Sequence, residues 1–390
     1  MSWDYKTLNE LGTVSRGRSR HRPRNDNSLF GGKYPFVQTA DVKAANFYLT
    51  DYTETYNEKG LEQSRLWKAG TLCITIAANI ADTAILGIDA CFPDSIMGFV
   101  PFEGVSNAKF IKYAFDMLQR DIKQISQGTA QDNLSWQKLE TIKFPAPDIK
   151  IQNKIVEILG TFDDLIENNQ KRIKILEEAA QRLYKEWFVD LRFPGYEDCK
   201  IVDGVPVEWK KKKLDEIADV IMGQSPKSEF YNKEHKGLPF HQGVGSYGAR
   251  FVQDDTYSTS FTKVAEANSI LFSVRAPVGR LNITKNKIVI GRGIAAINSK
   301  SGFQSYLFYA LKERFFKDDI LGNGAIFASI SKNELLNQVF VIPDEKIMSA
   351  YEKIAAALDK KIEVVDMQLQ QLVEARDRLL PKLMNGEIEV

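Results

Sequence analysis

The sequence predicts an α+β fold in which two similar heads are separated by two long helices that pair as an antiparallel intramolecular coiled coil. Three observations predict it. The chain repeats itself at a shift of about 200 residues, each copy opens with short apolar runs bounded by turn residues, and each copy ends in a long segment of helical periodicity. The repeat predicts a pseudo-two-fold relation between the two halves of the chain.

The internal repeat is collinear along the chain. A pattern Trp-x4-Leu-x-Glu-(Leu/Ile)-x2-Val-x2-Gly-x-Ser opens both copies, and further matches follow in the same order. A chance match over this length is improbable, so we interpret the repeat as a duplication. The aligned pairs are Trp3 and Trp209, Gly17 and Gly223, 71–76 and 269–274, Phe144 and Phe340, and Pro147 and Pro343.

The duplication divides the chain into four expected segments. Head 1 covers 1–147, a central long helix 148–195, head 2 196–343 and a C-terminal long helix 344–390. Within the heads, apolar runs bounded by Gly, Pro and Asn predict strands, and two longer runs predict helices. The expected strands are 34–37, 71–77 and 269–274, and the expected helices are 110–119 and 305–316.

The two long segments carry one apolar seam each. Apolar or small residues recur at gaps of three and four residues, in the same order in both copies, which is the 3.5-residue period of a coiled coil. Two ordinary core helices are the alternative, but a helix of about 40 residues, roughly 60 Å long, exceeds what one small core needs. The predicted seam residues are Ile155, Ile158, Phe162, Ile166, Ile173, Leu176 and Leu183 in the first helix, and Ile354, Leu358, Ile362, Leu369, Leu372 and Leu379 in the second.

Four residues in these segments are polar seam or helix-breaking positions. Asn169 falls on the seam, where a polar residue would fix the register of the pair. Pro194 and Gly195 should end the first helix, and Pro381 should kink or end the second.

Composition excludes several classes of protein. With 44% hydrophobic and 26% charged residues, disorder is not the dominant state. No apolar stretch is long enough to span a membrane, and the start lacks the pattern of a signal peptide. Three cysteines without a CxxC pair favour neither a disulfide framework nor structural zinc, so we expect a reducing, cytoplasmic setting. A formal charge of +1 argues against binding nucleic acid over the whole surface, but not against local basic patches.

One such patch lies near the start of head 1. Its five arginines, separated by Gly, Ser, His and Pro with no acid among them, suit a mobile loop that contacts phosphates and guanine edges. A solvated surface loop is the alternative. Head 2 carries a less basic loop at the matching place, with a glutamine that could read adenine. The candidate DNA-binding residues are Arg16, Arg18, Arg20, Arg22 and Arg24 in head 1, and Gln224, Ser225 and Lys227 in head 2.

Two further loops differ between the copies while their flanking strands keep the same apolar pattern. A fixed scaffold with divergent polar loops is what side-chain readout of base edges needs. For the last of these loops, structural turns explain the sequence equally well. The candidates are Asn79 and Asp94 in head 1 against Arg275, Arg280 and Arg292 in head 2, and then Gln127 against Asn323. The run 210–213 is four lysines, which suit a solvated face or a phosphate grip.

A search for catalytic chemistry finds none. Gly243–Gly248 matches G-x-G-x-x-G, but no helix pattern opens inside it, so a tight loop is expected. His21, His235 and His241 lack metal-ligand or triad spacing. A nuclease-like string ending at 359–361 lies on the predicted coil, where chance is the better explanation. No (Asn/Asp)-Pro-Pro-aromatic motif for a flipped base exists. The sequence therefore predicts no catalytic site, metal or cofactor in this chain.

Across nearly its full length the chain resembles the specificity subunit of type I restriction–modification systems. The resemblance rests on the tandem repeat, the Gly-x-Ser near the start of each head and the Phe-x-x-Pro closings at Phe144 and Phe340. It rests also on the two long helices and on their endings, 178–188 and 379–386.

The resemblance implies that each head is a target recognition domain for one half of a split double-stranded DNA site. The paired helices would set the gap and dock two modification subunits, through which restriction subunits join. Adenine methylation and cleavage, with S-adenosylmethionine, ATP and Mg, would belong to those partners. Two alternatives stay open: a two-headed protein-binding scaffold, and the specificity subunit of a related type II-like fused restriction system.

Overall fold

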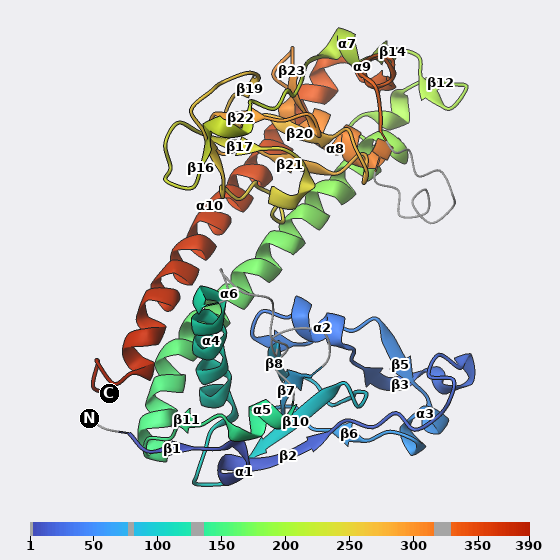
Figure 1. The fold of residues 1–390 in the computed structure, drawn as a ribbon. Helices are drawn as coiled ribbons and strands as arrows, with labels where there is room; N and C mark the ends of the chain where they lie inside the picture. Colours follow the sequence, from blue (N-terminus) through green and yellow to red (C-terminus); the bar gives the residue numbers. More distant parts are fainter. Residues whose placement is uncertain (1–2, 77–81, 126–135, 316–328) are drawn as a thin grey trace. The chain divides into compact units, whose positions relative to one another are not determined.

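The computed structural model describes residues 3–76, 82–125, 136–315 and 329–390 (Figure 1). By its internal contacts the chain forms two units. Unit 1 is Met1–Lys171 with Asp366–Val390, and unit 2 is Arg172–Val365. Each unit therefore contains one head and one part of each of the two long helices, α6 (Ile149–Tyr184) and α10 (Glu345–Met384).

Head 1 is built on two sheets. The larger has the order β2-β10-β7-β8-β4, the smaller β5-β3-β9-β6, and β1 pairs with β11. The strands are β1 (Tyr5–Lys6), β2 (Gly12–Arg16), β3 (Phe30–Phe36), β4 (Tyr48–Leu49), β5 (Glu54–Tyr56), β6 (Leu66–Trp67), β7 (Leu72–Thr75), β8 (Thr83–Leu86), β9 (Ala90–Cys91), β10 (Ile96–Pro101) and β11 (Phe144–Pro145). The helices are α1 (Leu8–Leu11), α2 (Thr39–Ala44), α3 (Glu58–Glu62), α4 (Ala108–Ile125) and α5 (Trp136–Thr141).

Head 2 repeats this plan. One sheet has the order β15-β23-β20-β21, a second sheet has the order β16-β18-β17-β22-β19, and β14 pairs with β24. The strands are β12 (Ile201–Val202), β13 (Val205–Pro206), β14 (Lys210–Lys213), β15 (Ala218–Met222), β16 (Tyr231–Asn232), β17 (Leu238–His241), β18 (Tyr257–Ser258), β19 (Val264–Ala265), β20 (Ile270–Ser273), β21 (Leu281–Ile283), β22 (Ile288–Ile290), β23 (Ile294–Ser299) and β24 (Val339–Ile342). The helices are α7 (Leu214–Ile217), α8 (Gln304–Phe315) and α9 (Lys332–Leu336).

Strand register confirms that the two heads share one framework. In head 1 the antiparallel pair β10 and β2 matches Met97 with Arg16, and in head 2 the pair β23 and β15 matches Ala295 with Met222. These are the positions that the sequence repeat aligns. The short helices α1 and α7, which precede β2 and β15, have the same N-terminal hydrogen bond. The backbone N–H of Thr7 donates to Glu10, and that of Lys213 donates to Glu216.

In unit 1, α6 and α10 pack against each other and against head 1. Their buried residues join one apolar core with α4 and the larger sheet, including Ile155 and Leu159 from α6 and Leu380 and Leu383 from α10. The first part of α6 thus packs with the last part of α10, which makes the two helices antiparallel, as predicted (Figure 1).

Unit 2 buries the complementary parts of the helices. Ala180 and Tyr184 of α6 join Tyr351 and Ala355 of α10 in one core with head 2. Several rings meet here edge to face, among them Tyr351 with Trp187 at 5.8 Å between centroids. Aromatic pairs of this kind add about 0.5–1.5 kcal/mol each beyond the area they bury.

The predicted seam follows the buried face of the helices with one exception. Ile354 is 44% exposed, whereas the neighbouring Ala355 is fully buried in the core with Tyr306 and Tyr309 of α8. At this turn α10 packs against head 2 as well as α6, so the small alanine points inward. Ile155, Ile166, Ile173 and Ile362 are buried, and Ile158, Phe162, Leu176, Leu183, Leu358, Leu369, Leu372 and Leu379 are partly buried.

The helix ends differ from the sequence expectation. The α-helical part of α6 ends at Tyr184 and continues as a π turn to Val189, before the predicted stop at Pro194. Pro381 does not end α10, because it lies in the last turn and the helix continues to Met384. Because Pro381 has no backbone N–H, one helical hydrogen bond near the end of α10 is lost, and the helix tolerates this loss there.

Candidate DNA interface

The Gly-x-Ser loop is held in the same way in both heads. Gly17 N–H donates to the Ile96 carbonyl at 2.8 Å, and Gly223 N–H donates to the Ile294 carbonyl at 2.9 Å. A Cβ at either glycine would collide with a backbone carbonyl of the neighbouring loop. The glycine is therefore required by close approach, and it brings the first loop of each head against the loop that precedes β10 or β23.

In head 1 this loop carries the arginines, and several contacts fasten it. Gln63 accepts hydrogen bonds from the backbone N–H groups of Arg20 and His21, at 2.7 and 3.1 Å. The His21 ring pairs with Asp26 at 2.7 Å. The hydrogen bonds of Asp26, to Ser28 first and then to His21, lower the pKa of its carboxyl to about 2. The sequence suggests a mobile loop, whereas the structure ties it to the framework.

The arginines fall into two groups. The exposed side chains of Arg16, Arg18 and Arg20 form no hydrogen bond or ion pair within the described chain. Arg22 instead donates to the carbonyls of Ser19 and His21. Arg24 pairs with both carboxylate oxygens of Asp94 at 2.8 and 2.9 Å. The sequence predicts that both residues contact DNA, and in the structure their charges neutralise each other.

Arg65 is a neighbour of this loop that sequence reasoning missed. Its guanidinium stacks on the Trp67 ring at 3.9 Å and donates to Ser15 Oγ at 3.0 Å. In the sequence, an arginine two residues before a tryptophan only weakly predicts that the two side chains stack, because the stacking depends on the position of β6.

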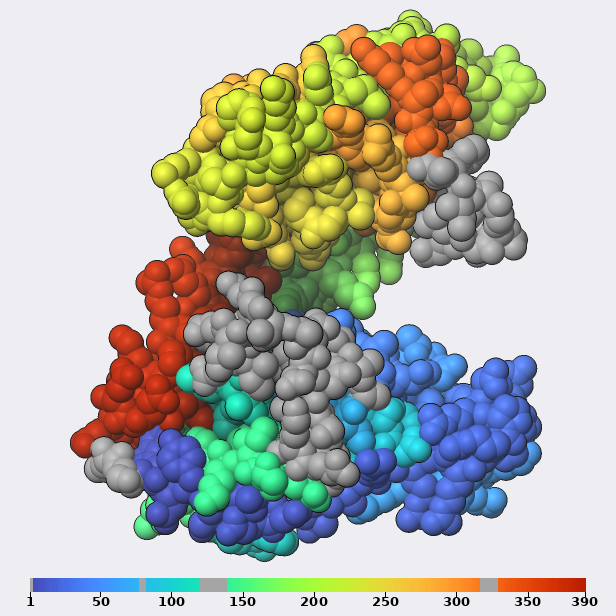
Figure 2. Space-filling model, in the orientation of Figure 1, coloured from blue at the N-terminus to red at the C-terminus, as the bar shows by residue number. Residues whose placement is uncertain are grey.

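In head 2 three loops meet. Gln224 N–H donates to the Ile290 carbonyl at 2.9 Å, and Arg292 N–H contacts Ser225 Oγ at 3.3 Å. Gly293 N–H donates to the carbonyl of Gln242, the residue after β17, at 3.1 Å. In Figure 2 the visible surface of head 2 is formed by segments coloured from yellow-green to orange that lie side by side. The structure thus brings together the predicted Gln224, Ser225 and Arg292, and adds Gln242.

The other predicted residues lie away from this cluster or outside the described residues. Lys227 is exposed and lies 3.8 Å from Glu229. Arg275 and Arg280 are exposed on the loop between β20 and β21. Asn79, Gln127 and Asn323 fall outside the described residues.

The histidines require a correction. Sequence spacing predicts no triad, yet the His241 ring lies between Ser246 Oγ, 2.8 Å from Nδ1, and Asp254, 3.0 Å from Nε2. The imidazole is fully buried, so this cluster fastens the loop after β17 to the sheet. Spacing along the chain could not reveal it because the loop folds back on itself. Gly243–Gly248 forms a tight loop with a short 3-10 turn, as expected.

A buried polar cluster joins head 1 to both helices within unit 1. The Tyr113 hydroxyl of α4 donates to Asp163 of α6, and Arg376 of α10 pairs with the same carboxylate at 2.6 Å. Burial raises the pKa of the Asp163 carboxyl, against the opposing influence of Tyr113 and Arg376.

Unit 2 repeats the tyrosine and the aspartate but takes its arginine from another place. Tyr309 of α8 donates to Asp359 of α10 at 2.8 Å, and Arg250 of head 2 pairs with Asp359 at 2.5 Å. Asp359, from the nuclease-like string, is therefore part of an ion pair between head and helix.

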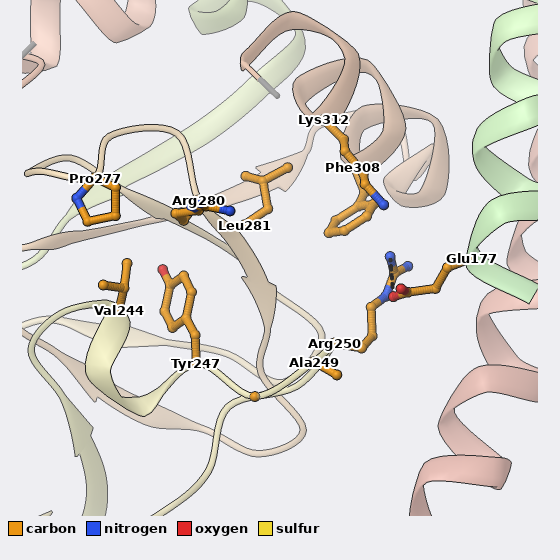
Figure 3. A pocket seen from close by; sticks show the side chains of 11 residues that line it. Glu177, Val244, Tyr247, Ala249, Arg250, Pro277, Arg280, Leu281, Phe308 and Lys312 are labelled. Atoms are coloured by element: carbon orange, nitrogen blue, oxygen red, sulfur yellow. Dashed lines mark ion pairs between the residues drawn. The ribbon is translucent and has the colours of Figure 1, made fainter. Parts of the chain in front are cut away.

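Arg250 also faces a cavity of about 380 Å³ within unit 2 (Figure 3). Its guanidinium stacks on Phe308 at 3.8 Å and lies 3.7 Å from Glu177 of α6. Burial raises the pKa of Glu177 and lowers that of Lys312, which also lines the cavity. Arg250, Lys312 and the two carboxylates Glu177 and Asp359 balance in charge, so the cluster holds head 2 on the helices.

Within the described ranges, no three His, Cys, Asp or Glu side chains are grouped as they would be to hold a metal ion. No described helix is long and apolar enough to cross a membrane.

The sequence matches the family of the type I restriction modification DNA specificity domain over residues 1–178 and 206–375. The chain belongs to this family. It is a non-catalytic specificity subunit (HsdS) of a type I restriction–modification enzyme, and its two heads are the target recognition domains.

Known specificity subunits align with most of the chain. A protein described as the MjaX specificity subunit of Methanocaldococcus jannaschii is 34% identical over 67% of this chain and 62% of its own length. The MjaIX specificity subunit of the same organism is 26% identical over 100% of this chain and 94% of its own. The solved structure of the type I S subunit from M. genitalium has a TM-score of 0.58 at 18% identity, covering 98% of this chain and 96% of that one, which shows the likeness of fold.

Proposed function

We propose that this specificity subunit reads a two-part DNA sequence, with each target recognition domain taking one half and the paired helices fixing the spacer between them. It thereby directs adenine methylation and cleavage by partner subunits. The observation that carries the proposal is the contrast at matching framework positions: Arg18 and Asp94 in head 1 stand where head 2 has Gln224 and Arg292. Two heads with the same framework but different side chains in their loops are suited to recognise different half-sites.

The partners follow from the same proposal. Two modification subunits dock on the helices, and restriction subunits join through them, with S-adenosylmethionine, ATP and Mg held by these partners. Exposed apolar side chains on both helices would be covered in such a complex, and burying apolar surface favours association between proteins. They are Leu165 and Ile175 on α6, and Ile354, Val364 and Met367 on α10.

The free arginines of head 1 give the test. Arg16, Arg18 and Arg20 contact phosphates in this proposal, so each contact releases counterions when DNA binds. DNA binding should be measured for the chain together with its modification subunit, on a duplex that contains the site they methylate. A range of about 50 to 200 mM salt is suitable, because phosphate contacts change the affinity strongly over it. Each Arg→Ala substitution should lower the slope of log affinity against log salt by about 1.

Arg378→Ala is the control, since it removes an exposed arginine charge from α10, where Arg378 pairs with Glu374. It should leave the slope unchanged. Equal slopes for all four variants, or no DNA binding by the wild-type complex, would contradict the proposal, and the second result would favour a protein-binding scaffold.

A further inference from the structure

The cluster of three loops in head 2 contains a residue with no assigned role, Gln242. We infer that Gln242 reads a base in the major groove as one unit with Arg292 and Gln224, and that the half-site of head 2 therefore contains a guanine with an adenine beside it. The inference rests on the proposed function and specifies which DNA bases that site takes.

Backbone approach places Gln242 directly beside Arg292. A Cβ at Gly293 would collide with the Gln242 carbonyl. A Cβ at Gly291 would lie 2.9 Å from Gln242 Cα and 2.9 Å from Ser225 Oγ. The glycines on both sides of Arg292 therefore allow this loop to pack closely against the loops of Ser225 and Gln242. The arginine is presented from the middle of the cluster.

The three long side chains of the cluster are available to a ligand. Gln224, Gln242 and Arg292 are exposed, and none of their side chains hydrogen-bonds to a described residue. An ordinary surface glutamine would be equally free, so exposure alone decides nothing. What distinguishes Gln242 is that its backbone is fixed from both sides.

The first fixed side is the sheet. His241, the preceding residue, has no exposed side-chain surface, and its two ring nitrogens contact Ser246 and Asp254 at 2.8 and 3.0 Å. The second side is the loop of Arg292, through the hydrogen bond from Gly293 to the Gln242 carbonyl. A residue held this way loses little further backbone freedom when it binds, which favours specific recognition.

Head 1 supplies the contrast. The sequences Pro35–Gln38 and Pro239–Gln242 align as Pro-Phe-x-Gln, so Gln38 is the counterpart of Gln242. Gln38, however, donates from its amide nitrogen to Glu54 at 2.7 Å. The side chain of Gln38 is therefore hydrogen-bonded within its own head, whereas that of Gln242 is available to bind a ligand.

The hydrogen-bonding groups of Gln242 and Arg292 indicate which bases they recognise. A glutamine amide both donates and accepts, which matches N7 and the amino group of adenine in the major groove. An arginine fork donates twice, which matches O6 and N7 of guanine. Because Gln242 and Arg292 adjoin in the cluster, the two purines they read adjoin in the half-site.

The experiment is methylome sequencing of a host that expresses the full chain with its modification subunit, in wild-type, Gln242→Ala, Gln242→Glu and Arg292→Ala forms. Gln242→Ala should relax one adenine position of one half-site, with discrimination falling by about 5- to 150-fold, and Arg292→Ala should relax the adjacent guanine. Gln242→Glu, which keeps the shape, should turn the preference toward cytosine, whose amino group donates to a carboxylate. Gln38→Ala, the matched control, should leave both half-sites unchanged.

The outcomes separate the inference from the function beneath it. If the wild-type chain methylates a two-part site and the Gln242 variants methylate the same site, the inference is wrong and the proposed function stands. The inference is also wrong, and the proposed function still stands, if the half-site changed by Arg292→Ala contains no guanine. If wild-type methylation follows no two-part site, the proposed function itself fails.

Discussion

Replacing Arg376 with methionine tests how the two long helices are locked together in unit 1. Arg376 comes from α10 and Asp163 from α6, and their 2.6 Å ion pair is completed by Tyr113 from head 1. The Asp163 side chain is only 1% exposed. Methionine keeps the apolar stem of the arginine but leaves the carboxylate buried without its cation.

The expected cost follows from that burial. Breaking a buried ion pair by removing one partner costs about 3–5 kcal/mol, because the remaining charge has neither water nor a counterion. Arg376 is 22% exposed, so water reaches part of the site in the variant and the lower end, about 3 kcal/mol, is expected. Replacing the whole cluster with Tyr113→Phe, Asp163→Leu and Arg376→Met together should restore stability to within about 1 kcal/mol of wild type, since no buried charge then lacks its partner and Asp377, which also contacts Arg376, is 38% exposed to water.

Hydrogen exchange of peptides from α4 and the first part of α6 is the assay, because it reports unit 1 separately from unit 2. A loss of about 3 kcal/mol speeds exchange through opening by roughly 150-fold. Peptides from α8 should be unchanged. An Arg376→Met effect below about 1 kcal/mol, or a triple variant as unstable as the single one, would refute the reasoning.

The sign of the pH dependence follows from the same carboxyl. Burial raises the folded-state pKa of Asp163 above its ordinary value of 3.8, so the folded state binds the proton more tightly. Stability therefore falls as pH rises from about 4 through that folded-state pKa, and loss of Arg376 raises this pKa further. The deficit of Arg376→Met should be largest at neutral pH and should shrink on acidification. A deficit independent of pH would contradict this.

Two more predictions concern the recognition loops and the spacer. Gly293→Ala should destabilise head 2 by about 1–3 kcal/mol in hydrogen exchange of β17, because its Cβ meets the Gln242 carbonyl, whereas Gly243→Ala, whose Cβ meets open space, should change stability by less than about 0.5 kcal/mol. Deleting 166–172 and 362–368 together shortens both helices by about 10 Å and should change the preferred spacer in the methylome while both half-sites stay the same. An unchanged spacer would exclude a ruler role for the helices.

The architecture could be predicted because it repeats and is periodic. The duplication identified the heads, and the 3.5-residue period identified two helices that pair, since a coil of that length needs a partner. The buried face was less predictable where a helix has two neighbours. At Ile354 the heptad rule assumes that only α6 packs on α10, whereas head 2 packs there too and buries Ala355 instead.

The polar contacts could not be predicted, because they depend on residues far apart in the chain. Arg250 and Asp359 pair across 109 positions, and nothing in either local sequence distinguishes them from solvated charges. The aligned glutamines Gln38 and Gln242 look identical in sequence. They differ in the structure, where the side chain of Gln38 donates to Glu54.

Methylome sequencing of a host that carries this chain and its modification subunit tests the central claim most directly. The account predicts adenine methylation at one motif made of two specific half-sites with a non-specific spacer of fixed length. It also predicts that substitutions in head 1 and in head 2 change different halves. Methylation at a single continuous motif, or one half-site altered by substitutions in both heads, would contradict the account.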